Sequence, residues 1–153
     1  MIVIFFCAGA ASAQKSGALK PCRLLTAAEA GKILGVKVEL KADDREANES
    51  LCYYAAADGE KGVSVILRGY PNRKQARDFF MSNRKLQANL CNGFKLVSNV
   101  GESAWMCEIS GYSKYIGVLQ NNVMFEFSVT AEKFPAAALK RRARQIAARL
   151  RAN

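Results

Sequence analysis

The chain has 153 residues, with 23 basic and 13 acidic side chains, no histidine and a formal net charge of +10 at pH 7. The lack of histidine excludes Ser-His-Asp and Cys-His catalytic arrangements and most metal-dependent hydrolase sites. The length and a hydrophobic content of 50% suit one domain with a core of its own.

The chain opens with an apolar run from Ile2 to Ala11. This run is shorter than the about 20 residues that cross a bilayer, but it has the length of a signal-peptide core, and Ala11-Ser12-Ala13 has the small-x-small pattern of a cleavage site. No Lys or Arg precedes the run, and a buried N-terminal strand is the alternative. We expect residues 1–13 to be a signal peptide, 14–21 a disordered segment and 22–153 a single domain. The protein is then secreted or periplasmic, with no transmembrane segment.

Cleavage after residue 13 would remove Cys7 and leave an even number of cysteines: Cys22, Cys52, Cys91 and Cys107. In an exported domain this number predicts two disulfides, for which three pairings exist. We favour the sequential pairing, because each bridge then ties a helix or loop to a nearby strand. A zinc site is disfavoured, since the chain has no closely spaced cysteine pair and no histidine.

The first half of the domain contains a capped helix followed by strands. Thr26-Ala27-Ala28-Glu29 is a capping box, and the short helix that it begins ends at Gly35. Residues 42–50 are expected to be a loop, and Asp58-Gly59 a turn. Alternation of apolar and polar residues predicts three strands, at 36–41, 51–56 and 63–67.

The second half repeats this order without repeating the sequence. A helix is predicted from Pro71-Asn72 to about residue 89, followed by an irregular stretch at 90–101. Pro135 is predicted to begin the last helix, whose apolar stripe ends at Leu150. Three further strands are predicted, at 105–109, 115–119 and 123–129.

The predicted order is therefore α-βββ-α-βββ-α, which places the chain in the α+β class. Strands with one polar face need cover on the other face only. We expect an antiparallel sheet made of two three-stranded meanders, covered on one face by the two long helices.

Several segments together carry a resemblance to a known group of proteins. They are "PCRLLTAAEAGKILG", "LCYYA", "NRKQARDFF", "VGESAWM" and "YIGVLQNNVMFEFSV". The chain resembles small exported bacterial α+β domains of unknown function, such as actinobacterial secreted lipoproteins and the extracellular sensor domains of PknH-type kinases, which implies a PsbP/Mog-like fold. The resemblance implies a bridge between Cys22 and Cys52 and brings no catalytic motif. This chain lacks a lipobox, so a lipid anchor is not implied.

Basic residues are concentrated on the two long predicted helices. If both helices cover the same face of the sheet, these residues form one basic layer that attracts an anionic envelope component or an acidic protein. The alternative is a solvated surface, because basic side chains suit helix C-termini and the flanks of apolar stripes. The candidate anion-binding residues are Arg73, Lys74, Arg77, Arg84, Lys85, Lys140, Arg141, Arg144 and Arg151.

Successive side chains of a strand point to opposite faces of a sheet. If one face of the sheet is open, this alternation places three residues in a shallow groove, the second candidate binding surface: Tyr54, Arg68 and Tyr70. Acidic residues concentrated between Glu39 and Glu49 fit no EF-hand spacing and are interpreted as a solvated loop rather than a calcium site. No phosphate-binding glycine loop and no aromatic-basic motif for nucleic acid is present.

These observations predict a non-enzymatic exported binding or interaction domain, with no cofactor and no metal site. The first alternative is an envelope-associated accessory or structural protein that has no ligand. The second is an enzyme that uses carboxylate, Lys or Tyr chemistry, which would require a cleft containing a carboxyl group of perturbed pKa.

Overall fold

A computed structural model describes residues 20–46 and 48–151 of the chain. The predicted signal peptide, residues 1–13, lies outside the described residues, and so does most of the predicted N-terminal segment. Pro21, which was predicted to belong to that segment, is buried and begins a short helix. The folded domain therefore includes Pro21, whose fixed φ suits the first position of a helix.

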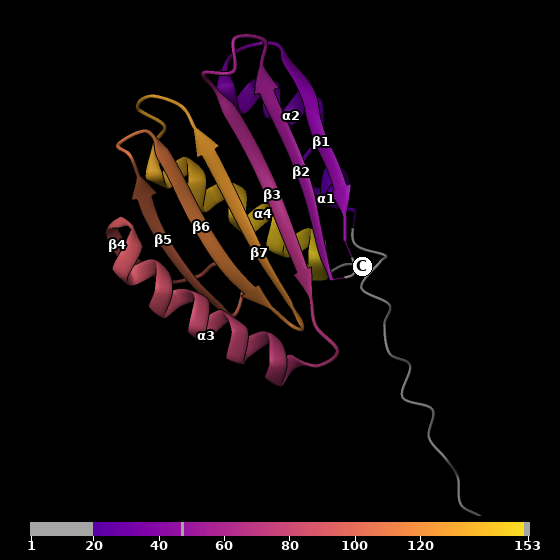
Figure 1. Cartoon of the computed structure of the whole chain (residues 1–153), viewed down its shortest axis with the longest axis vertical. Helices are drawn as coiled ribbons and strands as arrows, with labels where there is room; N and C mark the ends of the chain where they lie inside the picture. Colours follow the sequence, from indigo (N-terminus) through magenta and orange to yellow (C-terminus); the bar gives the residue numbers. More distant parts are fainter. Residues whose placement is uncertain (1–19, 47, 152–153) are drawn as a thin grey trace, which may run out of the picture.

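The centre of the molecule is one antiparallel sheet of seven strands in the order β1-β2-β3-β7-β6-β5-β4 (Figure 1). The α+β class is thereby confirmed. The strands are β1 (Val38–Arg45), β2 (Glu49–Ala56), β3 (Gly62–Gly69), β4 (Asn92–Val97), β5 (Ser103–Ile109), β6 (Ser113–Gln120) and β7 (Val123–Thr130). The helices are α1 (Pro21–Leu24), α2 (Ala27–Leu34), α3 (Arg73–Leu90) and α4 (Ala136–Arg151).

The first meander is confirmed, since β1, β2 and β3 pair in sequence order. The strand β1 is longer than predicted. Residues 42–45, expected in a loop, continue it after a register shift between Leu40 and Ala42, and Asp43 pairs with Cys52 of β2. The polar sequence of this segment suits a strand at the edge of a sheet, where side chains on both faces meet water.

The second meander has four strands rather than three, which corrects the prediction of an irregular stretch at 90–101. The extra strand is β4, in which Leu96 lies opposite Trp105 of β5. Strand β4 is the last strand of the sheet and its residues are half-buried or exposed, so its burial pattern does not alternate regularly. The two meanders join where β3 pairs with β7, with Val65 opposite Phe127.

The two long helices lie on opposite faces of the sheet, so the prediction that they cover the same face is wrong. Figure 1 shows α3 in front of the sheet and α4 behind it. In β5, Trp105 and Cys107 pack in the cluster that contains Phe80 of α3, whereas Met106 packs in the cluster that contains Leu139 of α4. Strands β5 to β7 carry apolar side chains on both faces of the sheet, so both faces must be shielded from water by other elements. We call these two sides the α3 face and the α4 face.

Two disulfides join the pairs Cys22–Cys52 and Cys91–Cys107, which confirms the sequential pairing. The first bridge ties α1 to β2, across a sequence separation of 30 residues. The second ties the C-terminal end of α3 to β5. The described part of the chain contains no helix that is both long enough and apolar enough to span a membrane.

Candidate binding groove between α3 and β4

An open groove with a volume of about 530 Å³ lies between the second half of α3 and the edge strand β4. Its position follows from the sequence of each element. Helix α3 turns Ala76 and Phe80 inward, so the positions that flank this stripe face the edge of the sheet. The residues that line the groove are Met81, Ser82, Arg84, Lys85, Ala88, Phe94 and Leu96.

The floor of the groove rests on a rigid part of the molecule. Phe94 stacks on Trp105, with a distance of 6.2 Å between ring centroids. Trp105 is 1% exposed and packs with Phe80 and the Cys91–Cys107 bridge. Since one bridge anchors both the end of α3 and the start of β4, the two walls of the groove are fixed relative to each other.

The groove combines exposed apolar side chains with cations. Met81 is 42% exposed and Leu96 is 62% exposed, and Ala88 and Phe94 line the same groove. Exposed apolar residues scattered singly need no explanation, but a contiguous apolar surface rimmed by polar residues is typical of an interaction site.

The cations of the groove are not neutralised. Among the described residues, neither Arg84 nor Lys85 has a carboxylate within ion-pair distance, and Arg77, about two turns earlier, has none either. The basic residues at the start of α3 differ. Arg73 donates to Glu102 at 2.7 Å and Lys74 donates to Asp78 at 2.7 Å. The free positive charge of α3 is therefore located beside the groove.

The candidate cations of α4 lie on the other side of the sheet, so the predicted single basic layer does not form. Arg144 donates to the backbone oxygen of Asn99 at 2.8 Å, just beyond β4. Lys140 lies one turn before Arg144 on the same flank. In the described part of the chain no carboxylate pairs with Lys140, Arg141 or Arg151. The two basic surfaces are separate, because the helices that carry them cover opposite faces.

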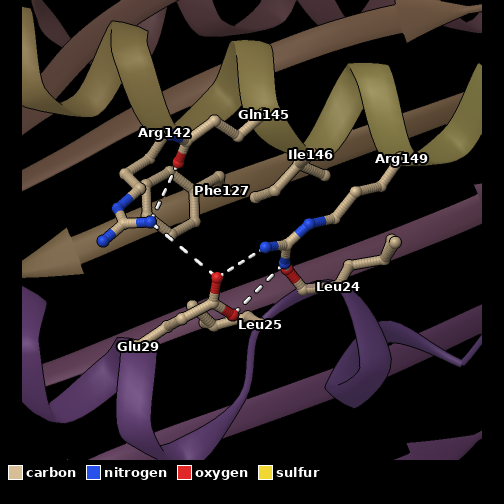
Figure 2. Close-up of a pocket in the computed structure, with 8 residues that line it drawn as sticks. All are labelled: Leu24, Leu25, Glu29, Phe127, Arg142, Gln145, Ile146 and Arg149. Atoms are coloured by element: carbon tan, nitrogen blue, oxygen red, sulfur yellow. Dashed lines mark hydrogen bonds and ion pairs between the residues drawn. The ribbon is translucent and has the colours of Figure 1, made fainter.

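The other flank of α4 forms a structural contact with α2 (Figure 2). Glu29 points from α2 toward two arginines of α4, with Arg149 Nη2 at 2.6 Å and Arg142 Nη1 at 3.9 Å from Glu29 Oε1. Hydrogen bonds from Arg149 hold the pKa of Glu29 at about 2, below its ordinary value of 4.5. The neighbouring cavity has a volume of about 10 Å³, which is about one water molecule. This cluster joins two helices and has no room for a ligand.

The three residues of the predicted sheet groove do not come together. Tyr54 is buried among the core residues of the α4 face, and burial raises the pKa of its hydroxyl. Arg68 and Tyr70 lie on the side of α3, where the Tyr70 ring is 5.3 Å from that of Phe79. The prediction placed Tyr54 on the same face as Arg68, whereas the register assigns it, with Val63, to the α4 face.

The positive charge of Arg68 is neutralised by two carboxylates, so Arg68 is not available to bind an anionic ligand. Its Nε donates to Glu49 at 2.6 Å and its Nη1 donates to Glu126 at 2.8 Å. Burial raises the pKa of Tyr70 to about 12, so this hydroxyl stays neutral and is a poor general base. The described residues contain no group of three cysteines or carboxylates that is arranged to hold a metal ion.

Sequence reasoning found the cations of the groove but missed its apolar residues. Phe94 and Leu96 lie in a stretch without alternation, from which the sequence predicts no strand, and Met81 lies on the predicted helix outside its apolar stripe. Lys95 between two apolar neighbours was the available signal for an edge strand. A scan against models of protein families and a search of curated proteins each found no match to this chain.

Proposed function

We propose that the protein is a non-enzymatic, exported binding domain that holds an anionic partner in the groove between α3 and β4. The observation that carries this proposal is the position of unpaired Arg84 and Lys85 beside exposed Met81 and Leu96. A surface cation without a counter-ion attracts an anion at long range, and an adjacent apolar surface adds contact area on binding.

The chemistry of the groove supports binding rather than catalysis. The residues that line it include no carboxylate, cysteine or tyrosine, so the groove has no carboxylate acid–base group and no thiol or phenol nucleophile. The groove therefore offers positive charge and apolar contact area without a carboxylate, thiol or phenol group.

Export is supported by the cysteines. Disulfides persist in oxidising compartments and are rare in the cytosol, and all four cysteines of the described residues form bridges. A secreted or periplasmic location suits this chemistry. The resemblance to small exported bacterial domains agrees with such a location and remains a prediction.

The test is a titration with anionic probes of three kinds: an acidic peptide, a heparin fragment, and vesicles that contain phosphatidylglycerol. Trp105 provides the signal, because the only tryptophan of the chain stacks under Phe94 in the floor of the groove. We expect at least one probe to bind, more weakly at high salt, since exposed charges are screened. The double variant Arg84→Gln/Lys85→Gln should bind it about tenfold more weakly, because each exposed ion pair contributes up to about 1 kcal/mol.

The matched control is Lys32→Gln/Arg141→Gln, which removes the same charge from exposed positions on α2 and α4. This control should retain the affinity of the natural sequence. Equal losses in both double variants would show that only net charge matters. If none of the three probes binds, the groove proposal fails and an accessory protein without a ligand becomes the better account.

A further inference from the structure

Strand β4 leaves one of its two edges unpaired. It is the last strand of the sheet and pairs only with β5. Within residues 20–46 and 48–151, no other strand or helix covers its outer edge with backbone hydrogen bonds. The outward N–H and C=O groups of an edge strand are a template for an added strand.

The groove lies beside the position that an added strand would occupy. Such a strand runs about 4.8 Å outside β4, and its alternate side chains project on the α3 face next to those of Phe94 and Leu96. Met81 and Ala88 form the opposite wall of the groove. The α3 face of the added strand would therefore carry apolar side chains.

Cations border this edge from both sides of the sheet. Arg84 and Lys85 lie on the α3 face. Lys95 lies on β4 itself, opposite Met106, whose side chain packs on the α4 face. Arg144 reaches Asn99 just beyond the end of β4. Carboxylates on the α4-facing positions of an added strand would lie beside Lys95 and Arg144, and Arg84 and Lys85 would attract the same strand at longer range from the α3 face.

The opposite edge of the sheet differs in its charge. On β1, Lys41 pairs with Glu39 at 2.7 Å and Arg45 pairs with Asp43 at 3.5 Å. The charges of β1 are thus largely satisfied within the strand, whereas β4 has an unpaired lysine. Of the two edges of the sheet in the described residues, β4 is therefore the one that attracts an acidic partner.

Two other occupants fit the surface less well. A second copy that paired through β4 would bring two sets of Lys95, Arg84 and Lys85 together, and like charges oppose such pairing. A flat bilayer would meet α3, whose outward side presents polar Asp78, Ser82 and Asn89, while its exposed apolar residues Phe79, Leu86 and Leu90 are confined to one flank.

We infer that β4 accepts an extended acidic segment of a partner protein as an eighth strand, with alternate apolar side chains in the groove and carboxylates toward the surrounding cations. This inference rests on the proposed function and adds the partner class and the mode of binding. Backbone hydrogen bonds supply affinity in this mode, and the groove selects the side chains.

The probe is a capped seven-residue peptide that alternates Glu with Val, titrated into the oxidised protein and followed by Trp105 fluorescence. Two further peptides carry N-methyl groups, one on the Val amides and one on the Glu amides. Methylation blocks one edge of a strand and leaves all charges in place. We expect one of the two methylated peptides to bind at least tenfold more weakly than the parent. Equal binding of all three peptides would overturn strand addition.

A pair of matched variants locates the binding edge. Leu96→Asp puts a carboxylate in the groove, and Leu40→Asp makes the same change on β1; both leucines are more than half exposed, so both variants should fold. We expect at least a tenfold loss for Leu96→Asp and no loss for Leu40→Asp. The reverse order, or binding to phosphatidylglycerol vesicles without binding to the peptide, would overturn the inference.

The same titrations separate the two proposals. If Arg84→Gln/Lys85→Gln weakens the parent peptide while both methylated peptides still bind like the parent, the groove binds anions without adding a strand. In that case the proposed function stands and the further inference fails. If the double variant binds the parent peptide normally, the proposed function itself fails.

Discussion

Glu29 has two roles at the junction of α2 and α4. Its carboxylate accepts from the Thr26 backbone at 3.0 Å, which completes the capping box of α2. It also accepts from Arg149 of α4, so the N-terminal helix is tied to the C-terminal one. Because the pKa of Glu29 is about 2 in the fold and its ordinary value is 4.5, the ionised form stabilises the folded state.

This coupling predicts how stability depends on pH. Glu29→Gln should lower the free energy of unfolding by about 1 kcal/mol at pH 7. The stabilisation is fully present above the ordinary pKa of 4.5 and is lost as pH falls toward 2, so the difference between variant and natural sequence should shrink over that interval. Urea unfolding at several pH values measures it. Glu60→Gln, at an exposed turn, is the control. A difference that stays constant with pH would contradict the assignment.

Gly117 is required by the ring that lies over it. A Cβ atom at this position would stand 2.3 Å from Cε2 of Trp105. Gly117→Ala should therefore displace the tryptophan, lower the free energy of unfolding by about 1–3 kcal/mol and change the fluorescence spectrum. Ser103→Ala, on exposed β5 surface, should do neither. An unchanged spectrum and unchanged stability in Gly117→Ala would show that the ring does not pack on this glycine.

Some single residues were predictable and others were not. The capping box could be recognised because Thr26 and Glu29 are three residues apart and act locally. The partner of Glu29 could not, since Arg149 is 120 residues away. The pairing of Arg68 with Glu126 also depends on the register between β3 and β7, which no local pattern specifies.

At the scale of elements, the two disulfides hold different parts of the molecule. Removing the Cys91–Cys107 bridge by Ala substitutions should lower the free energy of unfolding by about 3 kcal/mol and weaken groove binding, because the bridge joins α3 to β5 under the groove. Removing Cys22–Cys52 should cost about 4 kcal/mol but leave the affinity unchanged. Urea unfolding and the acidic-peptide titration measure both effects. Equal losses of affinity would contradict separate roles.

Strands could be predicted from the sequence where one of their faces is more deeply buried than the other. Strands β2, β3 and β7 alternate between buried and half-buried residues and could be predicted. Strand β4 could not be predicted, because neither of its faces is fully buried and its sequence therefore does not alternate between apolar and polar residues. The faces of the helices could not be assigned either. Leu119 of β6 and Met124 of β7 are buried under α3, whereas Val118 and Phe125 beside them are buried on the α4 face, so both faces of these strands are apolar and alternation does not mark a side for either helix.

At the scale of the whole molecule, the account predicts the state of the exported chain. Intact mass with and without reduction should show a chain that begins at Gln14 and four thiols that become reactive only after reduction. Such a result agrees with signal-peptide cleavage and an oxidising compartment. A purified chain that retains Met1 and reacts with alkylating agents before reduction would contradict export.

The basic residues of α3 and α4 lie on opposite faces of the sheet, and composition alone could not show that division. Each long helix pairs two of its cations with carboxylates, Arg73 and Lys74 on α3 and Arg142 and Arg149 on α4. What distinguishes α3 is that its unpaired Arg84 and Lys85 line a groove that also has an apolar wall. The sequence identified basic helices as the candidate surface. The three-dimensional arrangement selects the one that also borders an unpaired strand.

The most direct test of the groove is a map of amide chemical shifts during titration with the acidic peptide. We predict that the largest changes fall on residues 81–88 of α3 and 92–97 of β4, with smaller changes at Trp105 beneath them. Changes confined to α4, to β1 or to the face of β2 and β3 would place the binding site elsewhere. No change at saturating peptide would contradict the account.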